Sequence, residues 1–132
     1  MQVNFMRNFP WGRETCFRQK ILDKVKIHTM RETQHLRPGH NIQMIDGGRF
    51  CKDKEQFNEE KCTLEQMCEV EISEYGSFTI KIDGRVLEKE EHWQLAKNDG
   101  FESAFQFYRW LLIQNKPYIT LYIKHWTDYL RY

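Results

Sequence analysis

The stretch KVKIHTMRE (Lys24–Glu32) decides how this chain is interpreted, because it is dense in polar groups and directly follows a predicted helix. That helix is ETCFRQKILD (Glu14–Asp23), whose apolar residues lie four positions apart. Lys26 and Thr29 share a side only if the backbone turns, whereas Thr29 and Arg31 share a side in an extended strand. A turn leading into a strand therefore aims all three side chains at one place.

Further strands are predicted after this stretch. RPGH (Arg37–His40) is predicted to be a turn, since proline presets φ and glycine tolerates a positive φ. NIQMID (Asn41–Asp46) is a predicted strand, and Gly47-Gly48 after it is a hairpin signal. Arg49–Leu64 is polar and weakly periodic, so we expect a surface excursion, with a helical turn at most.

Alternating apolar residues predict three more strands. Cys68–Ile72 and Phe78–Ile82 alternate cleanly on either side of Tyr75-Gly76, so we expect an antiparallel pair with one buried face. YITLYIKHW (Tyr118–Trp126) alternates in the same way and is the last predicted strand.

Two helices are predicted between these strands. Leu87–Asn98 has a helix-forming composition, and Gly100 is placed to end it. Phe101–Gln114 carries apolar residues at i, i+3, i+4 and i+7. The predicted inward-facing residues of the two helices are Leu87, Trp93, Ala96, Phe101, Ala104, Phe105, Tyr108, Leu111 and Leu112.

This order of elements predicts an α+β fold. Strands dominate both ends and the helices come late, which is not the regular alternation of a parallel α/β protein. The 132 residues suit one domain. We expect a single domain over residues 1–132, a small and mostly antiparallel β-barrel with flanking helices.

The charge pattern limits the partners. A formal net charge of +1 is too small for a protein that holds long duplexes through many phosphates. Arg13–His40 nevertheless carries seven Lys or Arg against three acids, and Asp46–Tyr75 carries nine acids against four bases. This asymmetry favours a local site for a small anionic or hydrogen-bonding ligand near the basic segment.

The cysteines and the opening residues indicate a cytoplasmic protein with no metal. The four cysteines form no C-x-x-C pair and match no zinc spacing, so we expect no metal site and no cofactor. The opening MQVNFMRNFPWGR lacks the apolar core of a signal peptide, and no apolar run is long enough for a membrane helix.

Several of these features together resemble the ASCH domain, a member of the PUA-like superfamily. The resemblance lies in ILDKVKIHTMR (Ile21–Arg31), in the Pro-Gly turn and strands that follow, and in LAKNDGFES (Leu95–Ser103). Here the family's Lys-x-x-Thr-x-Arg pattern is carried by Lys26, Thr29 and Arg31, and its distant acid corresponds to Asp99. The elements cover roughly residues 17 to 123.

The resemblance implies a PUA-like barrel with a cleft where these four residues meet. It also implies a ligand, which would be RNA, a nucleotide or a modified nucleoside. In a bacterial branch that hydrolyses acetylcytidine, the lysine is the base, the threonine the nucleophile and a glutamate the acid. The sequence differs at two positions: the pattern's glycine before the lysine is Lys24, and the acid is aspartate.

We therefore predict that Lys24, Lys26, Thr29 and Arg31 bind the ligand of an RNA-, nucleotide- or nucleoside-binding domain. The alternative is an amidohydrolase in which Lys26, Thr29 and Asp99 are catalytic. Lys24 and Arg31 would then lower the pKa of Lys26 through their positive charge.

Each of these residues also has an ordinary structural explanation. Lys26 would be an exposed strand lysine, and Thr29 a β-branched residue that suits a pleated strand. Arg31 would pair with Glu32 or with an acid of Asp46–Tyr75, and Asp99 would cap the second late helix.

Other polar and aromatic residues give weaker signals. His28 alternates with Thr29 and is predicted to point to the opposite face, as a packed or surface histidine. Trp93 and Trp126 are the better candidates for base stacking, although each also suits a structural role. The aromatic segment Lys124–Tyr132 is the only hint of a third function, a protein-binding module.

Overall fold

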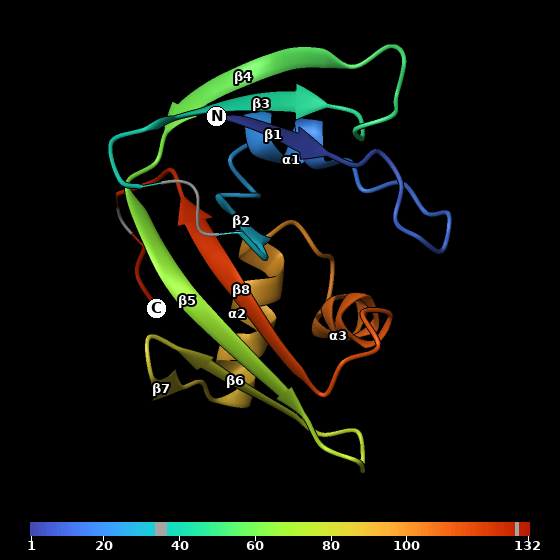
Figure 1. Ribbon diagram of the computed structural model, residues 1–132, viewed down its shortest axis with the longest axis vertical. Helices are drawn as coiled ribbons and strands as arrows, with labels where there is room; N and C mark the ends of the chain where they lie inside the picture. The colour runs from blue at the N-terminus through green and yellow to red at the C-terminus, as the bar shows by residue number, and fades with distance from the viewer. Residues whose placement is uncertain (34–36, 129) are drawn as a thin grey trace.

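The computed structural model describes residues 1–33, 37–128 and 130–132, which form eight strands and three helices. The strands lie in two sheets, one of three strands and one of five. Figure 1 shows the three-stranded sheet at the top of the view and the five-stranded sheet below it.

The five-stranded sheet is antiparallel throughout. Its order is β2-β8-β5-β6-β7, and every neighbouring pair is antiparallel. The strands span β2 His28–Arg31, β5 Leu64–Ile72, β6 Phe78–Ile82, β7 Arg85–Val86 and β8 Tyr118–His125. The alternating apolar residues of β5, β6 and β8 therefore lie as the sequence predicts, although β5 begins four residues earlier than expected.

The three-stranded sheet contains two strands that the sequence analysis did not predict. β3 (Asn41–Asp46) lies between β1 (Gln2–Phe5), which is parallel to it, and β4 (Glu55–Lys61), which is antiparallel. The interpretation of Arg49–Leu64 as a surface excursion is wrong, because β4 occupies most of its second half. β4 is an edge strand whose residues are all exposed or half-buried, so it has no apolar alternation to identify it.

The helices cover the two sheets separately. α1 (Phe17–Leu22) contributes Ile21 to a core with β1 and β3, while α2 (Lys89–Asn98) and α3 (Ala104–Leu112) pack on the larger sheet. Phe17 contacts both cores. The site described below lies where these two cores meet.

The α+β class and the mostly antiparallel pairing are confirmed, but the closed barrel is not. In the described residues, hydrogen bonding joins the strands into two separate sheets and does not close them into one barrel. β2 follows α1 in the chain and is an edge strand of the larger sheet. Its free edge therefore faces the smaller sheet (Figure 1).

Three predicted inward-facing positions of the helices are wrong. Trp93 is 47% exposed, Phe105 is 83% exposed and Leu112 is 54% exposed. In α2 the inward side is held by Leu95 and Ala96, and by a buried His92 that hydrogen-bonds Tyr108 at 2.7 Å. α3 begins after Ser103, whose hydroxyl accepts from the backbone N–H of Gln106, so Phe101 precedes the helix.

Candidate functional site

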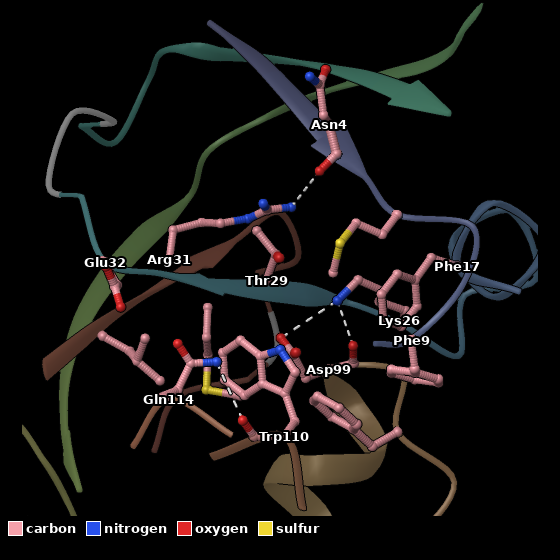
Figure 2. Close-up of a pocket in the computed structure, with 14 residues that line it drawn as sticks. Asn4, Phe9, Phe17, Lys26, Thr29, Arg31, Glu32, Asp99, Trp110 and Gln114 are labelled. Carbon is pink, nitrogen blue, oxygen red and sulfur yellow. Dashed lines mark hydrogen bonds and ion pairs between the residues drawn. The ribbon is translucent and has the colours of Figure 1, made fainter. Parts of the chain in front are cut away.

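A pocket of about 300 Å³ opens between the two sheets, next to β2. Its wall combines polar side chains from β1 and β2 with aromatic rings from α1, α3 and the connecting loops (Figure 2). The lining residues are Asn4, Met6, Phe9, Phe17, Lys26, Thr29, Met30, Arg31, Glu32, Asp99, Phe101, Trp110, Gln114 and Leu121.

The pocket brings together Lys26, Thr29, Arg31 and Asp99. The turn before β2 aims Lys26, and the extended backbone of β2 aims Thr29 and Arg31, as the spacing predicted. Asp99 arrives from the C-terminal end of α2, seventy-three residues later in the chain, where it is the C-cap. It does not cap α3, since Ser103 does so.

Lys24 does not belong to this site. Its side chain is exposed, it is not among the lining residues, and its φ is +60°. The left-handed backbone at this turn is one that glycine adopts without a steric cost. The structure therefore gives no support to the prediction that Lys24 binds a ligand at this pocket, because the residue lies in the turn before β2 and does not line the pocket.

Lys26 is almost completely buried, with 1% of its surface exposed. Nζ donates to the backbone carbonyl of Asp99 and lies 3.5 Å from Asp99 Oδ1 (Figure 2). It also donates to the backbone carbonyl of His28 at 3.0 Å. The ring of Phe17 is 4.6 Å from Nζ. Burial lowers the pKa of Lys26 to about 8, against the opposing attraction of Asp99. The reading of Lys26 as an exposed strand lysine is wrong.

Asp99 is held from its other side by a buried hydrogen-bond chain. His28 Nδ1 lies 3.1 Å from Asp99 Oδ1, and His28 Nε2 lies 2.6 Å from the Tyr132 hydroxyl. Asn98 Nδ2 donates to the same hydroxyl at 2.9 Å. Burial lowers the pKa of His28, so the imidazole is neutral at pH 7. The carboxylate accepts the Nδ1 proton, and Nε2 accepts the Tyr132 proton.

His28 thus lies on the face opposite Thr29, as the alternation predicted, and is a packed histidine. Sequence reasoning missed its contact with Asp99, because the two residues are seventy-one positions apart. Sequence reasoning also missed the contact between Tyr132 and His28, because no position in the fold was predicted for the end of the chain.

Thr29 and Arg31 complete the polar wall. Thr29 is 3% exposed, and its hydroxyl makes no hydrogen bond to Lys26 Nζ. Arg31 donates from Nη2 to the Asn4 carbonyl at 2.8 Å, and its guanidinium lies 5.3 Å from the Phe5 ring centre. Arg31 forms no ion pair within the described residues, so the predicted pairing with Glu32 is not observed there.

Four aromatic rings of the pocket were missed as site residues. Phe9, Phe17, Phe101 and Trp110 line it, and Phe9 and Phe101 stack with their ring centres 5.7 Å apart. Neither predicted stacking tryptophan is a lining residue: Trp93 lies on the exposed side of α2, and Trp126 packs against the core of the smaller sheet. Trp110 was not among the predicted inward-facing residues of its helix, so the helical spacing gave no signal for its place in the pocket.

Within the part of the chain that the structure describes, no three His, Cys, Asp or Glu side chains cluster as metal ligands would. Nor does any described helix have the length and apolarity to cross a membrane.

Gly100 allows the site to close around Lys26. Its φ is +98°, and a Cβ added there would lie 2.9 Å from Phe17 Cε1 and 3.0 Å from Lys26 Cδ. Replacing Gly100 with alanine is expected to lower the free energy of unfolding by about 1–2 kcal/mol, through backbone strain and displacement of these side chains. Urea unfolding measures the loss.

Gly76 provides the control for this change. Its φ is +81°, but a Cβ there would meet nothing within 4 Å, so Gly76→Ala carries the backbone strain alone. Equal losses in the two variants would contradict a close approach at Gly100.

The low pKa of Lys26 predicts a stability gain in mild alkali. Between about pH 8 and the ordinary lysine value of 10.5, the unfolded chain binds the Lys26 proton and the folded chain does not. The free energy of unfolding therefore rises with pH in this window, by at most about 1.4 kcal/mol per pH unit from this group. Below pH 8 the group adds no pH dependence.

Urea unfolding from pH 7 to 10.5, with Lys26→Met alongside, measures this effect. The variant removes the titrating group, so the difference between the two proteins isolates Lys26 from other groups that titrate in the window. Parallel profiles for the two proteins would show that Lys26 keeps an ordinary pKa when folded.

A scan against protein-family models finds none that matches the chain, and searches of curated proteins and of solved structures also find no match.

Proposed function

We propose that this chain binds a nucleobase-bearing ligand, a nucleoside, a nucleotide or an unpaired RNA base, with the base in the pocket beside β2. The observation that carries the proposal is the meeting of Lys26, Thr29, Arg31 and Asp99 with aromatic rings in one pocket of about 300 Å³. Bases outside a duplex are recognised by stacking on aromatic rings and by hydrogen bonds to their polar edges.

The polar groups on the wall suit the edge of a pyrimidine. Asp99 Oδ1 is occupied by His28 and Lys26, whereas Oδ2 makes no hydrogen bond with the described residues and is left to accept from a ligand. A carboxylate that accepts from the exocyclic amine of cytosine is an established mode of base reading. Thr29 offers a hydroxyl to the ligand. Gln114 offers its side-chain carbonyl, since its Nε2 already donates to the Trp110 carbonyl at 3.2 Å.

The same arrangement supports a relationship to the ASCH domains, which we also propose. Lys26, Thr29 and Arg31 line one pocket with Asp99, which is far away in the sequence, and Lys24 takes the backbone conformation that the pattern's glycine would favour. On this proposal the two sheets are a partly opened form of the PUA-like barrel.

A second function is favoured by the burial of Lys26: hydrolysis of an acylated nucleobase such as acetylcytidine. With a pKa of about 8, roughly a tenth of Lys26 is neutral at pH 7 and able to act as a base. Thr29 is on the same wall, and Arg31 offers donors for an oxyanion. The two backbone carbonyls that accept from Nζ stabilise the charged form instead, which is why binding is the first proposal.

The hydrolytic route would start from neutral Lys26 and an Asp99 carboxylate. Lys26 takes the Thr29 proton, the hydroxyl oxygen attacks the acetyl carbon, and the C–N bond breaks as Asp99 passes the Lys26 proton on to the amine. Water then hydrolyses the acetyl ester, which restores the Thr29 hydroxyl and releases acetic acid. Asp99 is shorter than the glutamate of the enzymatic relatives, and a misplacement of about 1 Å costs on the order of a hundredfold in rate.

Calorimetric titration with cytidine tests the binding proposal. Thr29→Val removes one hydroxyl and keeps the shape, so we expect cytidine to bind about 2- to 10-fold more weakly. Thr120→Val is the matched control, since Thr120 is an exposed threonine of β8 outside this pocket. Failure of the wild-type chain to bind cytidine, uridine and adenosine would refute the proposal.

Incubation with acetylcytidine tests the hydrolytic alternative. Cytidine formation is followed by chromatography, with Lys26→Ala run alongside to exclude a contaminating enzyme. Turnover that disappears in the variant would establish the hydrolase. Equal turnover in both samples, or none, would remove that chemistry for this substrate.

A further inference from the structure

A second hollow borders the base pocket across Arg31. It has a volume of about 350 Å³, and it shares Asn4, Met6 and Arg31 with the first pocket. Arg31 therefore lies between the two hollows, with its Nη2 turned to the Asn4 carbonyl at 2.8 Å (Figure 2). The remaining lining residues are Met1, Gln2, Val3, Thr33, Gly48 and Arg49.

This second hollow is positively charged. Arg31 and Arg49 both line it, and its described lining contains no carboxylate. Arg49 comes from the loop after β3, which brings it to the same place as the end of β2. Thr33 adds a hydroxyl.

The two arginines differ from most others in the described chain, because neither forms an ion pair there. Arg7, Arg13, Arg18 and Arg85 all lie within 4 Å of a carboxylate. Arg31 has a buried Nε with no hydrogen-bond partner in the described part, and only its Nη2 has a recorded acceptor. A guanidinium with free donors is suited to bind an oxyanion through two parallel hydrogen bonds.

We propose that the second hollow binds a phosphate, so that the ligand is a nucleotide or an RNA strand, with its base in the first pocket and its phosphate on Arg31 and Arg49. This inference rests on the proposed base-binding function and adds the chemical class of the ligand. The source of the phosphate is a monoester in a free nucleotide or a diester in RNA, and both present the same oxygens.

Calorimetric titration with cytidine, cytidine 5′-monophosphate and the dinucleotide CpC tests the inference. Hydrogen bonds from a charged donor predict that at least one phosphate-bearing ligand binds about tenfold more tightly than cytidine. Arg49→Met is expected to remove that gain. Arg109→Met is the control, since Arg109 is exposed, has no ion pair in the described residues and lies outside both hollows.

The outcomes separate this inference from the proposed function. If cytidine binds and the phosphate adds nothing, or if the gain survives Arg49→Met, the phosphate site is refuted while the base pocket stands. If none of the three ligands binds, the phosphate site is refuted, and the base pocket fails with it when uridine and adenosine do not bind either. A gain confined to the monophosphate identifies a free nucleotide, and a gain shared by CpC identifies RNA.

Discussion

Replacing Asp99 with asparagine is expected to lower the free energy of unfolding at pH 7 by about 3–5 kcal/mol. The change keeps the side-chain shape but removes the negative charge 3.5 Å from the buried Nζ of Lys26 and 3.1 Å from His28. Breaking a buried ion pair on one side leaves the other charge without compensation, and this costs more than the pair itself contributes. Urea unfolding measures the loss.

An exposed ion pair provides the control. Asp53 pairs with Arg7 at 2.8 Å, closer than Lys26 and Asp99, but its side chain is 79% exposed. Asp53→Asn is therefore expected to cost much less than Asp99→Asn, because solvent screens the pair. Equal losses in Asp99→Asn and Asp53→Asn would show that burial does not strengthen the Lys26–Asp99 interaction.

The double variant Lys26→Met, Asp99→Asn completes the cycle. Both charges are then absent, so the loss should be smaller than the sum of the two single losses. The cost of Asp99→Asn should also shrink near pH 10, since Lys26, with a pKa of about 8, has already lost its proton there. If the loss in the double variant equals the sum of the two single losses, Lys26 and Asp99 do not interact in the folded protein.

The local geometry of β2 was predictable from sequence. The positions of Lys26, Thr29 and Arg31 follow from side-chain periodicity in a turn and a strand, which depends on neighbouring residues only. Lys24 was predicted together with these residues but does not line the pocket, and its φ of +60° places it in a left-handed turn before β2.

The long-range parts of the site could not be derived from periodicity. Asp99 was identified by a resemblance, and its contact with His28 depends on how α2 packs behind β2. β4 was missed because its backbone hydrogen bonds to β3 hold it in the sheet, while its side chains are polar on both faces. β1 was missed because its parallel partner lies about forty residues away.

The aromatic wall illustrates the same limit. Trp110 was not among the inward-facing positions predicted for α3, yet its ring packs against the core through Phe101 and Phe107. Whether an inward residue meets other side chains or a pocket depends on where the helix ends relative to the sheets. Trp110 packs on other side chains and also lines the pocket, since its ring is half-buried.

Replacing Trp110 with alanine is accordingly expected to weaken cytidine binding by about 1–3 kcal/mol, or roughly 5- to 150-fold, because a base loses its stacking surface. Trp110→Phe retains an aromatic face and should keep most of the affinity. Trp93→Ala is the matched control, since Trp93 is a half-exposed tryptophan of α2 outside the pocket, with Lys97 Nζ 4.9 Å from its ring centre.

Calorimetric titration measures the affinities, and circular dichroism at the titration temperature shows that each variant is folded. Trp110 also packs on Phe101, so its loss from the core will lower the melting temperature. Weakened binding in a folded Trp110→Ala protein, with Trp110→Phe near wild type, therefore reports the contact with the base. Unchanged affinity in Trp110→Ala would remove α3 from the binding surface and leave the polar wall of β2 as the whole of the site.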